Sequence, residues 1–414
     1  MNKFYQELFS LFLESPKIDT HEHLLPPKQF RENPDILLSI LERSYLSWIL
    51  SGTTGKSSGL TREELLSRLK TIPASSFYRY LIRAFQFMYE FRENTLNREN
   101  WEGLSQQIRE SYEKDDMIKK WLSGRLNIQK IILDRYWIVG DFQVDREIFS
   151  PVLRLDPFFF GYSREARDHD GQSPYFYADR EGIQVETFSE YLSLIDHILQ
   201  KGMREGISAL KLAIAYDRGL SFKQVTRTKA EVAFYRKAGE ETPEEIANFQ
   251  DFIFHYSFQK AEELGLPIQI HTGPGKAFQT APSLLGPILE EYRTVKVSLF
   301  HGGFPWVGEP GAMALFYPHL YLDLVWLPLL SPAFSRLALR EWLETTGGAR
   351  IMMGGDSWNV EGAVGSILFN LETMAQVLGE MVDTGYLSMN EAQEIGKMIL
   401  WDNPREFFLP PQEK

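Results

Sequence analysis

The segment Asp19-Thr-His21-Glu-His23 places two imidazoles at alternate positions. In an extended chain, residues i and i+2 point to the same side, so His21 and His23 can present their rings to one ion. Neutral imidazole is a good ligand for Zn²⁺ and similar divalent cations. Because eight histidines in 414 residues also produce a His-x-His pair by chance, the pair alone does not establish a metal site.

Three more polar residues follow apolar runs that are typical of strands. His271 ends the run 267–271, His301 ends the run 295–301, and Asp356 follows Ile351-Met-Met-Gly-Gly. Barrel enzymes keep their catalytic groups at the C-terminal ends of strands, so we expect these three residues to serve chemistry. The remaining histidines lack this placement and are interpreted as surface or core residues: His169, His197, His255 and His319.

Lys211 lies in the apolar run 208–216, on a face that it shares with Ala213 and Ala215. A lysine that points into a barrel is costly unless it is paired, neutralised or modified. Carbamylation would turn it into a carboxylate able to bridge two cations. Pairing with an acid such as Asp156 or Asp356 is the alternative, and both interpretations stay open.

The elements that must position these residues alternate between strand and helix patterns. Helical stretches such as 243–264 separate many of the apolar runs. This alternation predicts an α/β fold, and eight strands favour a closed (β/α)₈ TIM barrel over an open doubly wound sheet. No Gly-x-Gly-x-x-Gly turn follows the first strand to support a nucleotide-binding sheet. The predicted strands are 18–21, 128–133, 152–156, 208–215, 267–271, 295–301, 320–325 and 350–354.

The stretch 24–126 differs from the rest because its patterns are amphipathic and helical, as in 34–49, 61–69 and 76–91. We predict a mostly helical insertion between strands one and two that covers the barrel mouth. The metal-dependent barrel is then made of residues 1–23 and 127–414. The long segments 157–190 and 216–246 are interpreted as loops that form a lid.

Charge and composition argue against several classes of protein. The chain has 44 basic and 56 acidic side chains, a net charge of −12, which argues against nucleic-acid binding and against adhesion to anionic lipid. It contains no cysteine and no apolar run long enough to span a bilayer. The N-terminus is typical of an amphipathic helix and not of a secretory signal. We expect a cytoplasmic protein with a small-molecule substrate, and self-association stays open.

The series His21-x-His23, Lys211, His271, His301 and Asp356 resembles the ligand series of the amidohydrolase superfamily. The segment 399–408 is similar to the closing helix of the amidohydrolase-2 branch. The phrase 210–220, Leu-Lys-Leu-Ala-Ile-Ala-Tyr-Asp-Arg-Gly-Leu, resembles the amidohydrolase module of FluG-like and nodulin-like proteins. There the module is often fused to a glutamine-synthetase-like domain, which we expect this chain to lack because it ends at Lys414.

The resemblance implies one set of metal ligands: His21, His23, His271 and Asp356. His301 and Lys211 would complete a second position in a binuclear site, whereas His301 would serve catalysis in a mononuclear one. The resemblance implies one or two divalent ions, and Zn²⁺ is the ion that we expect. A bound divalent ion makes water acidic enough to attack at neutral pH. Asp356 would accept the proton, and the metal or His301 would stabilise the oxyanion.

The expected reaction is hydrolysis of a C–N or C–O bond in a small organic acid or amide. Arg135 and Arg218 are candidate clamps for an anionic group, because a guanidinium binds a carboxylate in bidentate geometry. Tyr216, Trp306 and Trp358 are candidate walls for an apolar portion of the substrate. Two alternatives remain: a decarboxylase or sugar-acid isomerase that uses the same site, and a metal-stabilised scaffold that binds a partner.

Overall fold

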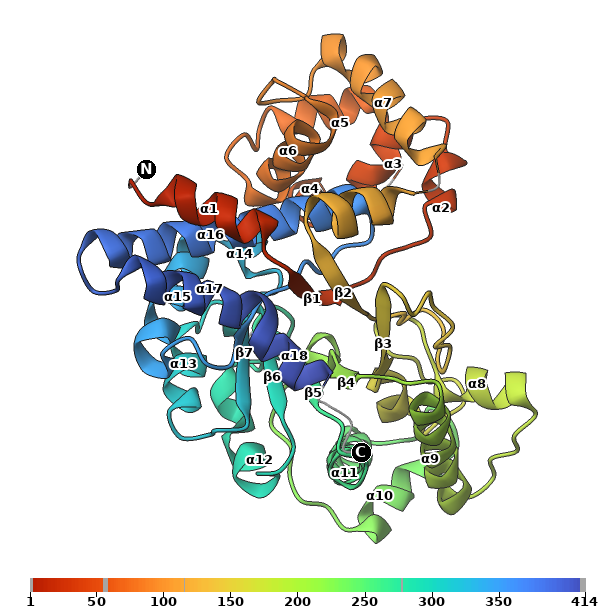
Figure 1. The fold of residues 1–414 in the computed structure, drawn as a ribbon. Coiled ribbons are helices and arrows are strands. Elements are labelled where there is room, and N and C mark those ends of the chain that lie inside the picture. The colour runs from red at the N-terminus through yellow and green to blue at the C-terminus, as the bar shows by residue number, and fades with distance from the viewer. Residues whose placement is uncertain (1–2, 55–58, 115, 277, 410–414) are drawn as a thin grey trace. The chain divides into compact units, whose positions relative to one another are not determined.

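The structure is a computed structural model that describes residues 3–54, 59–114, 116–276 and 278–409. Eight strands alternate with helices and form one sheet in the order β1 to β8 (Figure 1), and the pairings from β3 to β7 are parallel. The expected (β/α)₈ barrel is confirmed, and every predicted strand overlaps an observed one. The strands are β1 (Lys17–Glu22), β2 (Ile128–Leu133), β3 (Phe149–Arg154), β4 (Ala209–Leu212), β5 (Ile268–His271), β6 (Val297–Phe300), β7 (Leu320–Asp323) and β8 (Ile351–Met352).

The segment between β1 and β2 is helical, as expected. Its helices are α2 (Lys28–Arg31), α3 (Ile36–Glu42), α4 (Leu46–Thr54), α5 (Arg62–Leu69), α6 (Ser76–Tyr89), α7 (Arg98–Tyr112) and the π-helix Ile118–Arg125. The amphipathic pattern over 34–49 corresponds to two helices, because the chain breaks between α3 and α4. The Ser44 hydroxyl donates to the Leu41 carbonyl and accepts from the Leu46 amide, and such local bonds compete with a continuous helix.

The remaining helices surround the other strands. They are α1 (Tyr5–Glu14), α8 (Pro174–Glu181), α9 (Phe188–Arg204), α10 (Arg227–Phe234), α11 (Pro243–Leu264), α12 (Gly286–Glu291), α13 (Gly308–Ala314), α14 (Leu327–Leu330), α15 (Pro332–Thr346), α16 (Val360–Asp383), α17 (Met389–Lys397) and α18 (Asn403–Phe408). Helix α11 has the predicted bounds because Thr242 caps its start and Gly265, with φ +64°, ends it. The segments interpreted as loops contain α8 and α10, so they are partly helical.

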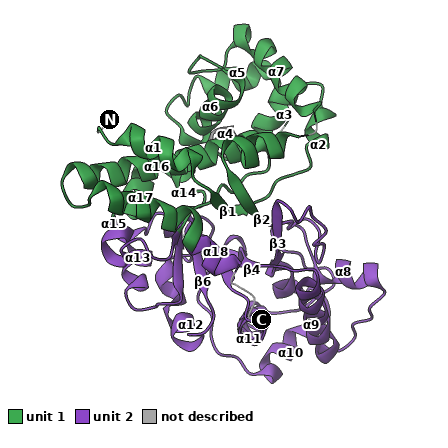
Figure 2. Ribbon diagram, in the orientation of Figure 1, with its two compact units in different colours: residues 1–131, 324–340, 352–402 green, residues 132–323, 341–351, 403–414 purple. Residues whose placement is uncertain are grey.

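The chain divides into two compact units (Figure 2). Unit 1 comprises residues 1–131, 324–340 and 352–402. Its central element is the mostly buried α16, against which α1 and α6 pack. Gly365 permits close packing with α6, because a Cβ there would lie 2.4 Å from the Tyr80 carbonyl oxygen. The helices between β1 and β2 belong to this unit, and their predicted place over the barrel mouth stays a prediction.

Within unit 1, helices of the insertion also hold the start of α16. The buried Glu361 accepts hydrogen bonds from Tyr89 of α6 at 2.6 Å and from Tyr112 of α7 at 2.7 Å. Helix α16 begins four residues after Asp356, so this contact braces the segment that carries the predicted site residue.

Unit 2 comprises residues 132–323, 341–351 and 403–414. Its strands β4 to β7 are buried on both faces, as expected for parallel strands covered by helices. The register aligns Arg154 with Lys211, Lys211 with Gln269, and Gln269 with Ser298. Polar side chains from four neighbouring strands therefore occupy one layer of this unit.

Candidate functional site

The two histidines of β1 lie together, as their spacing predicts. Their Nε2 atoms are 3.3 Å apart and their rings meet edge to face with centroids 4.7 Å apart. Both side chains are almost fully buried, with His21 at 1% and His23 at 6% exposure. Two imidazole nitrogens this close are within reach of one ion.

Asp356 joins this pair from the segment that follows β8. Its Oδ1 lies 3.1 Å from Nε2 of His23 and 3.8 Å from Nε2 of His21. One ligand atom from each of the three residues lies within 4.8 Å of the others. Two imidazole nitrogens and one carboxylate oxygen form a donor set that suits Zn²⁺ or a similar divalent ion. The residues present therefore fit a metal centre in unit 1.

The backbone holds Asp356 in an unusual conformation. Its φ is +67°, a left-handed value that few residues other than glycine adopt, and its amide donates to the His21 carbonyl at 2.8 Å. His301 has a similar φ of +64°. Backbone strain of this kind costs about 1–3 kcal/mol and gathers at functional sites.

Asp19 and Glu22 form a buried carboxyl pair beside the candidate metal ligands, and the sequence analysis assigned them no role. Asp19 accepts from the amides of Gly355 and His21 at 3.0 and 3.2 Å, and Glu22 accepts from the Ser357 amide at 2.5 Å. Burial raises the pKa of Asp19 to about 6, and burial with the adjacent Asp19 charge raises the pKa of Glu22 well above its ordinary value. Both carboxyl groups therefore favour the protonated form more than an exposed carboxyl group does.

The two glycines before Asp356 make room for this pair. A Cβ on Gly355 would lie 1.9 Å from Oε1 of Glu22, and one on Gly354 would lie 2.5 Å from Oγ1 of Thr20. The Gly-Gly-Asp sequence is thus explained by close packing of the β8 end against β1. The sequence indicates the Asp19–Glu22 pair only by placing an acid on either side of His21 in one strand.

His271 and His301 lie together in unit 2, where His271 ends β5 and His301 follows the neighbouring β6. Nε2 of His301 is 2.9 Å from Nδ1 of His271, and the ring centroids are 4.3 Å apart. The Tyr216 ring packs on His271 with centroids 4.5 Å apart. That these two histidines and the three ligand candidates of unit 1 converge on one ion stays a prediction.

Lys211 is 2% exposed, and its Nζ lies 3.6 Å from the centroid of the Phe300 ring. The face of an aromatic ring attracts a cation, so this contact favours the charged ammonium over a carbamate. Carbamylation of Lys211 and its role as a metal ligand remain predictions.

The two arginines predicted to clamp an anion are both engaged with carboxylates. Arg135 lies 2.9 Å from Asp141, and Arg218 lies 2.8 Å from Asp251. Arg218 also lines a hollow of about 670 Å³ together with Phe278. A substrate anion would have to compete with these ion pairs, so the clamp role stays a prediction.

An aromatic cluster of unit 1 contacts His23 through Trp358. Trp358 stacks on the His23 ring with centroids 5.8 Å apart, and Tyr45 of the insertion packs on Trp358 at 4.9 Å and on Trp326 at 4.6 Å. Trp306, in unit 2, meets Phe278 at 6.4 Å. Tyr45 could not be predicted from sequence, because it carries no local signal and only the folded insertion brings it to Trp358.

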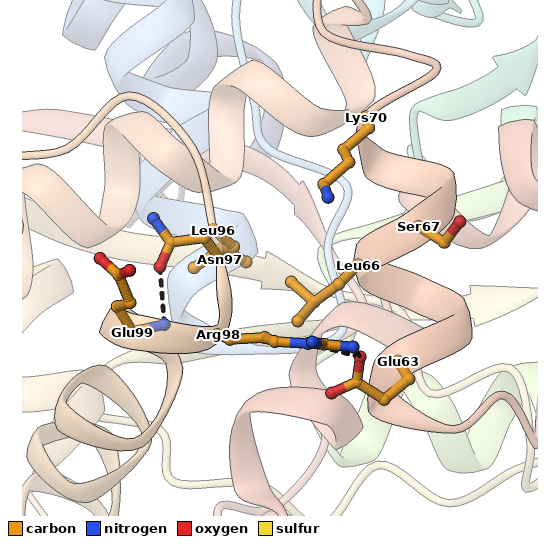
Figure 3. Close-up of a pocket in the computed structure, with 8 residues that line it drawn as sticks. All are labelled: Glu63, Leu66, Ser67, Lys70, Leu96, Asn97, Arg98 and Glu99. Atoms are coloured by element: carbon orange, nitrogen blue, oxygen red, sulfur yellow. Dashed lines mark hydrogen bonds and ion pairs between the residues drawn. The ribbon is translucent and has the colours of Figure 1, made fainter.

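A separate hollow of about 470 Å³ lies on the insertion between α5 and α7 (Figure 3). An ion pair between Arg98 and Glu63 crosses it, and its lining contains none of the predicted site residues. Among the helices of the described residues, we find none with the length and apolar character that crossing a bilayer requires.

Comparison with known proteins is consistent with this arrangement. Residues 237–409 match a protein-family model described as amidohydrolase. Protein fluG of Emericella nidulans is 26% identical over 160 residues, which cover 36% of this chain and only 18% of that protein.

Two solved structures share the fold over nearly the whole chain. Uronate isomerase of Thermotoga maritima superposes with a TM-score of 0.78 at 17% identity, covering 99% of this chain and 98% of that one. Glucuronate isomerase of Caulobacter crescentus gives 0.76 at 15% identity, covering 99% and 95%. At such low identity these likenesses establish the fold alone. The family match and the relationship to fluG show that part of this chain, including residues 237–409, is similar to the amidohydrolase superfamily.

Proposed function

We propose that the protein is a metal-dependent hydrolase that cleaves a C–N or C–O bond in a small organic acid or amide. The observation that carries the proposal is the buried group of His21, His23 and Asp356, whose ligand atoms lie within 4.8 Å of one another. These residues, with His271, would hold a single divalent cation, for which Zn²⁺ is the expected ion. The strong net negative charge of the chain supports a small-molecule substrate over nucleic acid or a membrane, and the cytoplasm is the expected location.

The side chains of the site divide the work of hydrolysis. A divalent cation held there would supply Lewis acidity, which lowers the pKa of water and polarises a carbonyl. Asp356 would accept the proton from the attacking water and pass it to the leaving group. His301 would donate a hydrogen bond to the oxygen that becomes negative. The contact of Lys211 with Phe300 supports a one-cation site, because a lysine that stays charged offers no ligand for a second ion.

A sugar-acid isomerase is the second candidate. It is favoured by the likeness to uronate isomerase over 99% of the chain, a span that includes the helical segment between β1 and β2. The two reactions differ in the use of water. Hydrolysis transfers a solvent oxygen to the product, whereas isomerisation moves a proton between adjacent carbon atoms and consumes no water.

Metal analysis and isotope labelling test the proposal together. Protein purified without chelator should contain a divalent ion at this site, and His21→Ala should lower the metal content by one equivalent, whereas the exposed His197→Gln should not. With an amide substrate, ¹⁸O from labelled water should enter the product. Asp356→Asn should retain the ion and lose at least about 10²-fold in turnover, the least that loss of a general base costs.

Two outcomes would redirect the proposal. Exchange of deuterium into a uronate, without ¹⁸O incorporation, would support the isomerase instead. Metal content unchanged in His21→Ala would refute the metal centre itself and, with it, both reactions.

A further inference from the structure

A second group of metal-ligating side chains lies in unit 2. Asp156 opens the 3₁₀ helix that follows β3, Asp217 follows the 3₁₀ helix after β4, and His169 comes from the segment between β3 and α8. One ligand atom from each of the three residues lies within 4.8 Å of the others. Nδ1 of His169 is 2.7 Å from Asp217, and its Nε2 is 3.2 Å from Asp170. Three elements far apart in the sequence thus bring one imidazole and several carboxylates together.

Negative charge exceeds positive charge in this group. The Arg154 guanidinium lies 2.7 Å from Asp134, 3.9 Å from Asp156 and 3.7 Å from Asp170. Even with His169 protonated, these two cations face a larger set of carboxylates: Asp134, Asp156, Asp168, Asp170 and Asp217. Three of these carboxylates, Asp134, Asp156 and Asp168, are buried, and a buried carboxylate is stabilised by taking up a proton or by a nearby cation.

Asp168 provides a second, independent observation that points to a cation. It is 5% exposed, and its Oδ1 accepts from the amides of Asp170 and Gln172 at 3.0 and 2.7 Å. Its Oδ2 is buried and has no hydrogen-bond partner among the described residues. Burial, followed by repulsion from Asp156, raises the pKa of Asp168 to about 7. A buried carboxylate oxygen is costly to leave without a partner, and a cation would supply one.

We propose that Asp156, His169 and Asp217 form a second divalent-cation site, with the Asp168 carboxylate as a further oxygen donor. Carboxylate oxygens predominate over a single imidazole, so the donor set favours a hard ion such as Mn²⁺. None of these residues belongs to the group around His21, so the site does not depend on the proposed function. The ion would replace the positive charge of the His169 imidazolium, whose pKa neighbouring Asp170, Asp217 and Asp156 raise to about 10.

Titration of metal-depleted protein with Mn²⁺, followed by electron paramagnetic resonance, tests the site. A double variant, His21→Gln with His23→Gln, should still bind one Mn²⁺ with a nitrogen coupling from imidazole. Adding His169→Gln should weaken that binding about 100-fold or more, since loss of even an outer partner of a ligand costs 10–100-fold. His255→Gln is the control, because His255 is another histidine of unit 2 that lies near an acid, 3.8 Å from Glu291, and it is outside the proposed site.

Each result has one meaning for the second site. Loss of binding on adding His169→Gln, but not His255→Gln, supports it. The second site is refuted if the His21/His23 double variant binds no Mn²⁺. It is also refuted if adding His169→Gln leaves Mn²⁺ binding unchanged. Asp217→Asn is a smaller change that should produce the same loss if His169→Gln impairs folding, which circular dichroism reports. Failure here leaves the metal content tested by His21→Ala untouched, so the two proposals can fail separately.

Discussion

Removing one tyrosine hydroxyl from the Glu361 network should destabilise the protein by a measurable amount. In Tyr112→Phe, the buried carboxylate loses a donor 2.7 Å away and keeps the one from Tyr89. A hydrogen bond to a charged group contributes about 1.5–3 kcal/mol. Unfolding entropy of about 2.1 cal/mol/K per residue, over 414 residues, converts this into a melting temperature lowered by about 2 to 3 °C.

The loss should also depend on pH. Burial raises the pKa of Glu361 and the two tyrosine hydroxyls lower it, so the variant raises the folded-state pKa further and leaves the unfolded pKa unchanged. A carboxyl with a raised folded pKa adds stability below its unfolded pKa and loses that stability as pH rises through the folded pKa. The difference between Tyr112→Phe and wild type should therefore be small in acid and reach its full size above the folded pKa of the variant.

Scanning calorimetry of wild type and Tyr112→Phe, from acid to above the folded-state pKa of Glu361 in the variant, measures this difference in stability. Tyr386→Phe is the control, because Tyr386 is 57% exposed and its hydroxyl lies outside the network. An equal loss at every pH, or a loss no greater than that of the control, would refute the assignment of Glu361 as a buried charge held by two hydroxyls.

Three further predictions follow from contacts already described. Gly355→Ala should lower the unfolding free energy by about 1–3 kcal/mol in thermal melts, because the added Cβ would overlap Glu22. Gly103→Ala is the control and should be neutral or stabilising, because a Cβ at Gly103 would have no atom within 4 Å. Arg154→Met should cost about 3–5 kcal/mol in denaturant unfolding by leaving Asp134 as a buried charge, and a cost below 1 kcal/mol would contradict the pairing. Chelation should lower the melting temperature and added Zn²⁺ should restore it, since a bound ion stabilises only the folded state; an unchanged melt would argue against a bound metal.

Much of the fold could be predicted from sequence because the strands carry continuous apolar runs and the turns between them carry polar residues. The same pattern located Asp356 behind β8 and His271 at the end of β5. Strand ends were less certain, and β8 is only two residues long where five were expected. The break between α3 and α4 escaped prediction because it depends on one serine hydroxyl, a local bond that an amphipathic pattern does not reveal.

Other parts of the site could not be predicted because tertiary contacts determine them. Arg218 was expected to meet an anion from the substrate, but Asp251, 33 residues later, lies beside it. His169 was interpreted as a surface or core residue because no strand precedes it, yet the fold brings it to Asp217. Nothing in the local sequence specifies where such segments return to the sheet.

The left-handed backbone at Asp356 has a consequence for engineering by randomised libraries. Aspartate and asparagine tolerate this conformation better than other residues with side chains, and β-branched or bulky replacements tolerate it poorly. A saturation library at this codon would therefore lose many clones through poor soluble yield before their chemistry is sampled. Screens at this position need an expression readout beside turnover, because the readout separates a misfolded chain from a folded chain that lacks the carboxylate.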